Sequence, residues 1–215
     1  MKKDDVRKAM LLYAVTDRTW LGENSLAQQV EDAIKGGATF IQLREKNLSD
    51  EEFLEEAKKI KAVTDKYNVP FVINDNIMVA KMADADGVHI GQSDMEAKKA
   101  RQILGNDKII GISAGNLEEA LTAEKNGADY IGIGAMFHTD TKSDATSVTF
   151  DEAKEITEKV NIPVVAIGGI NRDNVLSLKG TGVDGIAVIS AIFAQKDIYE
   201  ASSTLRALAE KLAER

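Results

Sequence analysis

Residues 163–170 read Pro-Val-Val-Ala-Ile-Gly-Gly-Ile, a short apolar run that ends in two glycines. Its hydrophobic residues follow one another without the polar alternation of a half-exposed strand. This pattern is typical of a strand that is buried on both faces of a parallel sheet. Glycines directly after such a strand permit a tight turn into the next helix. The stretch therefore predicts one strand-helix unit of an α/β protein.

Short apolar runs of the same kind recur at roughly even spacing along the 215 residues, with amphipathic segments between them. The segment 49–67 is one example, and it opens with the capping box Ser49-Asp50-Glu51-Glu52. Eight units of this kind predict a (β/α)8 TIM barrel that forms one domain over residues 1–215. The predicted strands are 11–15, 39–43, 70–73, 87–90, 108–112, 130–133, 163–167 and 185–189.

A doubly wound open sheet is the alternative to the barrel. It would be favoured by a glycine-rich fingerprint after the first strand, but Val15-Thr16-Asp17-Arg18 contains no glycine. Similar glycine-containing segments precede three strands, at 36–38, 127–129 and 182–184. This internal similarity favours the barrel.

Composition narrows the classes of function. The formal net charge is −8, and no basic run is present, so we expect no nucleic-acid partner. Cysteine is absent, which excludes disulfides and thiolate chemistry. No apolar stretch is long enough for a membrane span or a signal peptide, and we expect a cytoplasmic protein with no membrane partner. The sequence does not decide the oligomeric state, and both a monomer and a homo-oligomer are compatible with it.

Polar residues follow the predicted strands, at the end of a barrel where active sites lie. Gly168 and Gly169, a helix expected to start near Asn171, and Ile189-Ser190 resemble the phosphate site found after strands seven and eight of such barrels. A plain tight turn is the alternative. His89 lies inside a predicted strand and, like Tyr13, is interpreted as a packing residue.

Charged residues at these strand ends predict a diphosphate site. Asp75 and Asp94 follow neighbouring strands and offer the oxygen ligands that Mg²⁺ prefers, although both could instead be helix N-caps. Arg44, Lys46 and Lys142 are cations at the same rim, and they suit phosphate oxygens. Solvated loop charges are the alternative for these three.

Five blocks of residues in this order and spacing resemble the thiamine-phosphate synthase family: 42–46, 74–75, 89–94, 139–142 and 166–170. The likeness runs from about Leu12 to Ala194. It implies a (β/α)8 enzyme that joins 4-amino-2-methyl-5-hydroxymethylpyrimidine diphosphate to hydroxyethylthiazole phosphate and releases pyrophosphate. It also implies Mg²⁺ as cofactor and phosphorylated small molecules as partners.

The resemblance also implies roles for individual residues. Asp75 and Asp94 would bind Mg²⁺, and Arg44, Lys46, Ser113 and Lys142 would act in catalysis. The residues implied to bind the pyrimidine diphosphate are Gln42, Leu43, Arg44, Glu45, Lys46, Asn74, Ser113 and Lys142. Those implied to bind the thiazole phosphate are Thr139, Asp140, Thr141, Gly169, Ile189 and Ser190. Two positions depart from the family pattern, Ala135 where proline is expected and Gly115 where histidine is expected.

Three other functions are weighed against the synthase. A thiazole tautomerase of the same family would need an acid-base residue such as His138 and would have no use for Asp75, Asp94 or Lys142. A sugar-phosphate isomerase would share the phosphate site but would need a carboxylate or histidine base. A non-catalytic barrel that binds phosphates of the pathway would show no turnover.

Overall fold

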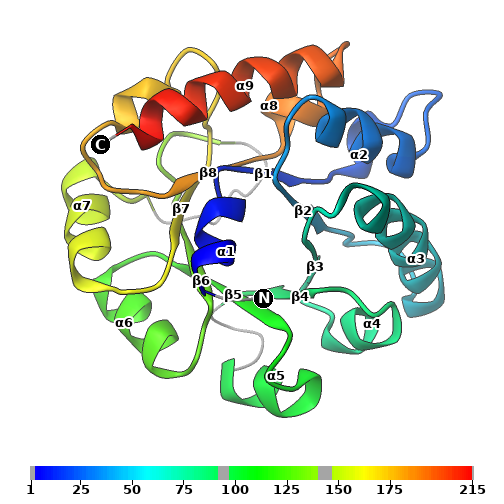
Figure 1. The fold of residues 1–215 in the computed structure, drawn as a ribbon, viewed down its shortest axis with the longest axis horizontal. Helices are drawn as coiled ribbons and strands as arrows, with labels where there is room; N and C mark the ends of the chain where they lie inside the picture. The colour runs from blue at the N-terminus through cyan, green and yellow to red at the C-terminus, as the bar shows by residue number, and fades with distance from the viewer. Residues whose placement is uncertain (1–2, 92–96, 140–146, 215) are drawn as a thin grey trace.

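Eight parallel strands form a closed barrel, β1-β2-β3-β4-β5-β6-β7-β8, in a computed structural model that describes residues 3–91, 97–139 and 147–214. β1 pairs with β8 as well as with β2, for example through Ala14 and Val188, which closes the sheet and excludes the open doubly wound alternative. Figure 1 shows the strands as a ring with helices around it. The strands are β1 (Leu12–Val15), β2 (Phe40–Leu43), β3 (Phe71–Asn74), β4 (Gly87–Ile90), β5 (Ile109–Ala114), β6 (Tyr130–Ile133), β7 (Val164–Ile167) and β8 (Gly185–Val188).

α-Helices follow every strand except β7 and cover the outside of the barrel. They are α2 (Leu26–Lys35), α3 (Asp50–Tyr67), α4 (Ile77–Met82), α5 (Ala97–Leu104), α6 (Leu117–Lys125), α7 (Phe150–Lys159), α8 (Ser190–Phe193) and α9 (Ile198–Ala213). The predicted capping box is confirmed, because Ser49 accepts from the Glu52 amide while the Glu52 side chain accepts from Ser49. Such caps satisfy amides at the helix start that have no partner within the helix.

Alternate residues of each strand enter two separate cores. One set faces the helices, and Leu43 with Phe53 and Ala57 belongs to this outer core. The other set fills the barrel interior, where Tyr13, Phe40 and Tyr130 lie together. The inner core explains why the strands look continuously hydrophobic, since both of their faces are buried.

The N-terminal segment closes one end of the barrel. Helix α1 (Lys3–Ala9) lies across the ring in Figure 1, and Val6 and Met10 pack into the inner core, where they are 2% and 0% exposed. Arg7 forms an ion pair with Asp184, which precedes β8. The amino ends of the strands are thus covered, so that a ligand would enter at their carboxyl ends.

The helix predicted near Asn171 is not present, and this prediction was wrong. A short 3₁₀ helix, η2 (Val175–Leu178), occurs there instead. Asn174 accepts from the Asn171 amide at 2.8 Å, and Asn171 accepts from the Asp173 amide at 2.9 Å. Such local bonds between asparagine side chains and the main chain compete with the start of an α-helix.

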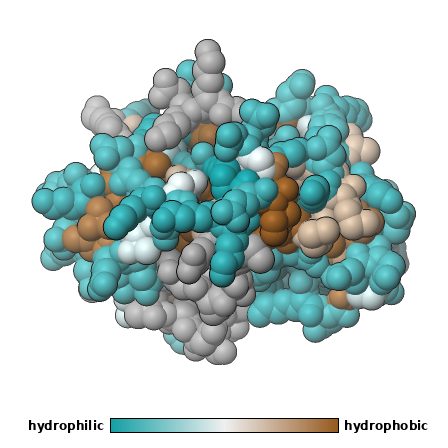
Figure 2. Space-filling model, turned by 90° about the horizontal axis from the view of Figure 1, so that it is seen from below, coloured by the Kyte–Doolittle hydropathy of each residue, from teal (hydrophilic) through white to brown (hydrophobic). Residues whose placement is uncertain are grey.

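The coloured part of the face in Figure 2 is mostly hydrophilic. Figure 2 shows one side of the molecule on which hydrophobic patches are separated by hydrophilic residues. Exposed large hydrophobic side chains include Met78 and Met82 on α4, Leu121 on α6 and Tyr199 on α9. In the described part of the chain, no helix combines the length and apolar character needed to cross a bilayer.

Candidate active site

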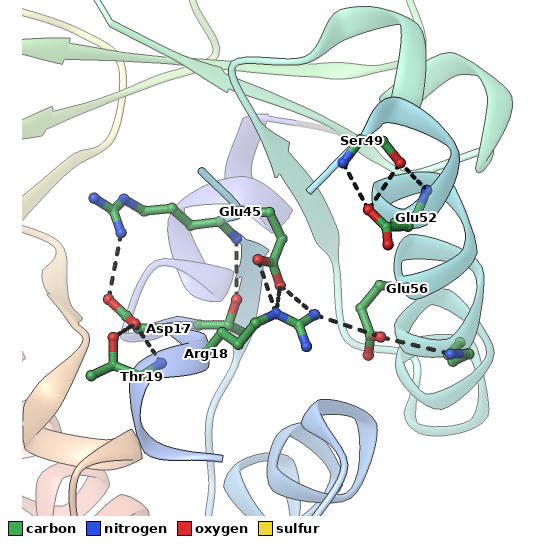
Figure 3. Close-up of polar contacts among 10 residues, drawn as sticks. Asp17, Arg18, Thr19, Glu45, Ser49, Glu52 and Glu56 are labelled. Carbon is green, nitrogen blue, oxygen red and sulfur yellow. Dashed lines mark hydrogen bonds and ion pairs between the residues drawn. The ribbon is translucent and has the colours of Figure 1, made fainter. Parts of the chain in front are cut away.

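Two ion pairs cross between the loops that follow β1 and β2. Arg44 Nη1 lies 3.5 Å from Asp17 Oδ2, and Arg18 Nη2 lies 2.9 Å from Glu45 Oε1. Figure 3 shows Arg18 between Glu45 and Glu56. Arg18 Nη2 lies 3.7 Å from Glu56 Oε2. The hydrogen bonds that the Arg18 guanidinium donates to Glu45 raise the pKa of Arg18 above its ordinary value. The four charges join the two loops at the mouth of the barrel.

Strand register brings these two loops together. Val15 pairs with Gln42, and the Thr16 amide donates to the Gln42 carbonyl at 2.9 Å. The Thr16 hydroxyl in turn accepts from the Arg44 amide at 3.1 Å, and Thr16 is fully buried. Asp17 accepts from the Thr19 amide at 2.9 Å, at the start of the 3₁₀ helix η1 (Arg18–Trp20). The Arg44 backbone and the Asp17 carboxylate are therefore both fixed in place.

The side chains of the predicted segment 42–46 lie in different environments. The Leu43 side chain packs in the outer core, so any part in binding would fall to its main chain. The Glu45 side chain is 4% exposed and is bound by Arg18. Lys46 is exposed, whereas Gln42 is buried inside the barrel. Arg44 and Lys46 are thus the described cations of this segment.

Asp75 follows β3 in an unusual backbone conformation. Its φ of 63° is left-handed, and its amide donates to the His89 carbonyl of β4 at 2.9 Å. Asn74 donates to the Asp75 carboxylate at 2.6 Å. Non-glycine residues seldom adopt this conformation, although aspartate tolerates it better than most. The backbone thereby holds an exposed carboxylate at the mouth.

The residues present fit Mg²⁺ in part. Asp75 offers a hard oxygen ligand of the kind that this ion prefers. Asp94, its predicted partner, lies outside the described residues. Within the described ranges, no group of three or more His, Cys, Asp or Glu side chains could hold a metal ion. A complete protein-only metal cage is therefore not formed by the described residues.

The two glycines after β7 are required by a neighbouring segment. Gly168 and Gly169 have φ values of 97° and 64°, which favour glycine. A Cβ on Gly169 would lie 2.4 Å from the His138 carbonyl oxygen, and one on Gly168 would lie 2.6 Å from Ala135 Cα. The loop after β6 therefore runs directly beside this turn. The predicted thiazole-phosphate residues Thr139 and Gly169 belong to neighbouring loops as a result.

Other predicted residues surround the same mouth or lie outside the described part. Ile189 follows β8, and Ser190 begins α8. Asn74, Ser113 and Ile189 are half-buried, whereas Ser190 is exposed. Asp140, Thr141 and Lys142 lie in the segment 140–146, which is outside the described residues.

Sequence reasoning missed two groups of residues. Asp17 and Arg18 were not assigned to the site, although charge at the end of the first strand was a signal for them. Tyr13 and Tyr130 were interpreted as packing or passed over, yet their hydroxyls are 2.8 Å apart in the barrel interior. The signal for these two residues was a tyrosine, with its polar hydroxyl, within an otherwise apolar strand.

Known proteins resemble this chain over nearly its whole length. Residues 12–192 match the family described as thiamine monophosphate synthase. A thiamine-phosphate synthase of Clostridium novyi is 58% identical over 90% of this chain and 96% of its own length. One of Clostridium botulinum is 52% identical over 94% of both chains.

A solved structure shows the same likeness in three dimensions. The thiamine phosphate pyrophosphorylase from Pyrococcus furiosus has a TM-score of 0.89 and 43% identity, and the match covers 96% of this chain and 98% of that one. Sequence identities of 43–58% over at least 90% of the chain show relatedness in sequence as well as in fold. The chain therefore belongs to the thiamine monophosphate synthase family, and it is a transferase of thiamine biosynthesis.

Proposed function

We propose that the chain condenses 4-amino-2-methyl-5-hydroxymethylpyrimidine diphosphate with hydroxyethylthiazole phosphate, giving thiamine phosphate and pyrophosphate. The observation that carries this proposal is the 58% identity to the thiamine-phosphate synthase of Clostridium novyi over 90% of the chain. The polar residues at the carboxyl ends of the strands support it, since this is the end of a barrel where chemistry occurs.

The pyrimidine diphosphate would bind beside β2, β3 and β5. Arg44 presents a planar fork to phosphate oxygens, and its ion pair with Asp17 limits where the guanidinium can lie. Lys46 is exposed and adds a movable positive charge. Gln42 and Ser113 enter the barrel from β2 and β5 and would contact the pyrimidine ring. Lys142 would contribute a further cation from the loop after β6.

Asp75 and Asp94 would hold Mg²⁺ at the same mouth. When bound, the ion would offset the negative charge of the diphosphate group. The protein would contribute the position of the Asp75 carboxylate, which its left-handed backbone and the bond from Asn74 define. Asn74 would also contact the pyrimidine diphosphate.

The reaction would need no protein nucleophile. The carbon–oxygen bond to the diphosphate breaks, and its electron pair leaves with pyrophosphate. The amino group of the pyrimidine spreads the resulting positive charge, while Arg44 and Lys142 stabilise the leaving group. The thiazole nitrogen then supplies the electron pair of the new carbon–nitrogen bond. Thr139, Asp140, Thr141, Gly169, Ile189 and Ser190 would hold the thiazole phosphate in position and help to exclude water.

An assay with omissions tests this function. Purified protein is mixed with Mg²⁺ and both substrates, and thiamine phosphate and pyrophosphate are measured with time. Formation of both products in equal amounts, lost when either substrate is omitted, is expected. Lys46→Ala should lower turnover, whereas Lys211→Ala, at an exposed position of α9, serves as the matched control. Isomerised thiazole without thiamine phosphate would favour the tautomerase instead.

A further inference from the structure

A chain of hydrogen bonds crosses the inside of the barrel between two predicted substrate-binding residues. Gln42 Nε2 donates to the Tyr13 hydroxyl, which lies 2.8 Å from the Tyr130 hydroxyl. Tyr130 is 2.9 Å from His89 Nδ1, and His89 Nε2 is 3.0 Å from Ser113 Oγ. The five side chains come from β2, β1, β6, β4 and β5. We call them the interior relay.

The centre of the interior relay is closed to water. Tyr13 is 1% exposed and Tyr130 is 0% exposed. A buried hydroxyl without a partner is unfavourable, so each must find its hydrogen bonds within the protein. Burial raises the pKa of both hydroxyls above the ordinary value for tyrosine. Both phenols therefore keep their protons at neutral pH.

Gly111 of β5 makes room for the interior relay. A Cβ on Gly111 of β5 would lie 2.1 Å from Tyr130 Cζ and 2.4 Å from its hydroxyl oxygen. A Cβ on Gly132 of β6 would lie 3.4 Å from His89 Cε1, which is ordinary van der Waals contact, so this position does not require glycine. Any side chain at Gly111 would displace the Tyr130 ring and its hydrogen bonds. The absence of a side chain at Gly111 therefore leaves space for the Tyr130 ring, whose hydroxyl links Tyr13 to His89.

Donor and acceptor roles follow from the Gln42 end. An amide nitrogen only donates, so the Tyr13 oxygen accepts from Gln42. Among the described residues, the other partner of the Tyr13 hydroxyl is Tyr130, which must receive its proton. Tyr130 then donates to His89 Nδ1. A neutral imidazole carries its proton on the other nitrogen, so Nε2 donates to Ser113.

The direction of the interior relay defines what its two ends offer. Gln42 uses its amide nitrogen on Tyr13, which leaves the amide oxygen as an acceptor. Ser113 accepts from His89, so its own proton donates to another group. One fixed acceptor and one fixed donor match an aminopyrimidine, whose amino group donates and whose ring nitrogens accept. A pyrimidine with an oxo group in place of the amino group reverses this pattern at that edge.

We propose that Tyr13, Tyr130 and His89 are positioning residues that fix Gln42 as an acceptor and Ser113 as a donor for the aminopyrimidine ring. This rests on the proposed function, in which Gln42 and Ser113 contact the pyrimidine. The three residues act through Gln42 and Ser113 and do not touch the reacting atoms. Their effect is on recognition of one substrate, which separates them from residues that only support the fold.

The first experiment uses Tyr130→Phe, which keeps the ring and removes the hydroxyl at the centre of the interior relay. The expected result is a rise of about tenfold or more in KM for the pyrimidine diphosphate, with KM for the thiazole phosphate unchanged. The preference for the amino over the oxo pyrimidine diphosphate should fall by a similar factor. Tyr67→Phe is the matched control, since it removes a surface hydroxyl bond to Glu31 at 2.7 Å. Wild-type values of KM and of the amino preference in Tyr130→Phe would overturn the proposal.

A second experiment determines the protonation state of His89 by NMR and does not depend on enzyme activity. The chain has 2 histidines, so ¹⁵N-histidine labelling gives two ring systems, and His138→Gln identifies that of His89. The proposal predicts the Nε2–H form of neutral His89 in the wild-type protein, whether or not Tyr130→Phe folds. The Nδ1–H form, or a charged ring at pH 7, would overturn it. Absence of condensation by the wild-type protein together with the Nε2–H form would count against the proposed function and leave the described relay direction intact.

Discussion

Arg44 faces Asp17 across the adjacent ends of β1 and β2, with Nη1 and Oδ2 3.5 Å apart and both side chains about 15% exposed. The guanidinium retains donors for phosphate oxygens because one carboxylate occupies only part of its fork. Asp17 thus directs a cation that is predicted to bind the diphosphate, at a point where the two strands are in register.

Asp17→Asn should lower kcat/KM for the pyrimidine diphosphate by about tenfold, because a misplaced Arg44 loses part of its effect on the leaving group. The asparagine can still accept from the Thr19 amide, so the free energy of unfolding should change little. Steady-state kinetics and urea unfolding measure the two effects. Glu55→Gln on α3, which removes an exposed ion pair with Lys58, is the control. Equal kinetics in both variants would remove Asp17 from the site.

Arg18→Ala should destabilise the fold by about 1–3 kcal/mol, because it leaves the buried Glu45 carboxylate without its partner. Urea unfolding measures the loss. The matched variant Lys58→Ala removes a solvent-exposed pair on α3 and should have little effect. Similar unfolding midpoints for the two variants would show that the Arg18–Glu45 pair contributes no more than a surface pair.

Asp75→Asn separates charge from backbone conformation. Asparagine tolerates the left-handed φ, so stability should be retained while activity and its Mg²⁺ dependence are lost. Asp75→Ala should lose activity and also about 1 kcal/mol of stability. Asp84, which has φ 51° and an ion pair with Lys108 at the other end of the strands, provides the control pair Asp84→Asn and Asp84→Ala. Full activity of Asp75→Asn would contradict a ligand role for this carboxylate.

Lys142→Ala should lower turnover about a hundredfold, equivalent to about 3 kcal/mol of transition-state stabilisation. The physical reason is loss of a cation near the departing diphosphate. Single-turnover kinetics measure the effect, with Lys154→Ala on the exposed side of α7 as control. A wild-type rate in Lys142→Ala would remove this lysine from the mechanism.

Acid should remove one stabilising contact between α2 and α3. Hydrogen bonds from Lys66 and Tyr67 lower the pKa of Glu31 from 4.5 to about 2. A carboxylate with a lowered pKa stabilises the fold above its unfolded pKa, and the contribution disappears as pH falls toward the folded value. The difference in unfolding free energy between wild type and Glu31→Gln should therefore be constant near pH 7 and shrink between pH 4.5 and about 2.

Glu158→Gln on α7 is the control for this pH dependence, because Glu158 is exposed and makes no hydrogen bond with its side chain among the described residues. Urea unfolding at several pH values compares the three proteins. A difference for Glu31→Gln that does not vary with pH would contradict the role of the Glu31 charge.

The barrel was predictable because each strand carries its own signal. Continuous apolar runs such as 163–167 placed all eight strands to within about two residues of their observed ends. The start of α3 was predictable as well, since Ser49 and Glu52 are close in sequence and form a local contact. The segment after β7 was misread because the Asn171 and Asn174 side chains bind nearby main chain instead of starting an α-helix.

Contacts that depend on strand register were not predictable from the sequence. The contact between Asp17 and Arg44 can be predicted only when the pairing of Val15 with Gln42 is known. Continuous hydrophobic runs also hide which alternate residues face inward. Tyr13 and Tyr130 are 117 residues apart, and only the closed barrel brings their hydroxyls together.

The most direct measurement adds both substrates and Mg²⁺ to the purified protein and follows the two products over time. We expect Mg²⁺-dependent condensation, in which thiamine phosphate and pyrophosphate form in a one-to-one ratio and the rate is abolished by excess chelator and restored by added Mg²⁺. Undiminished product formation in the chelator, or no thiamine phosphate from the folded protein, would contradict it.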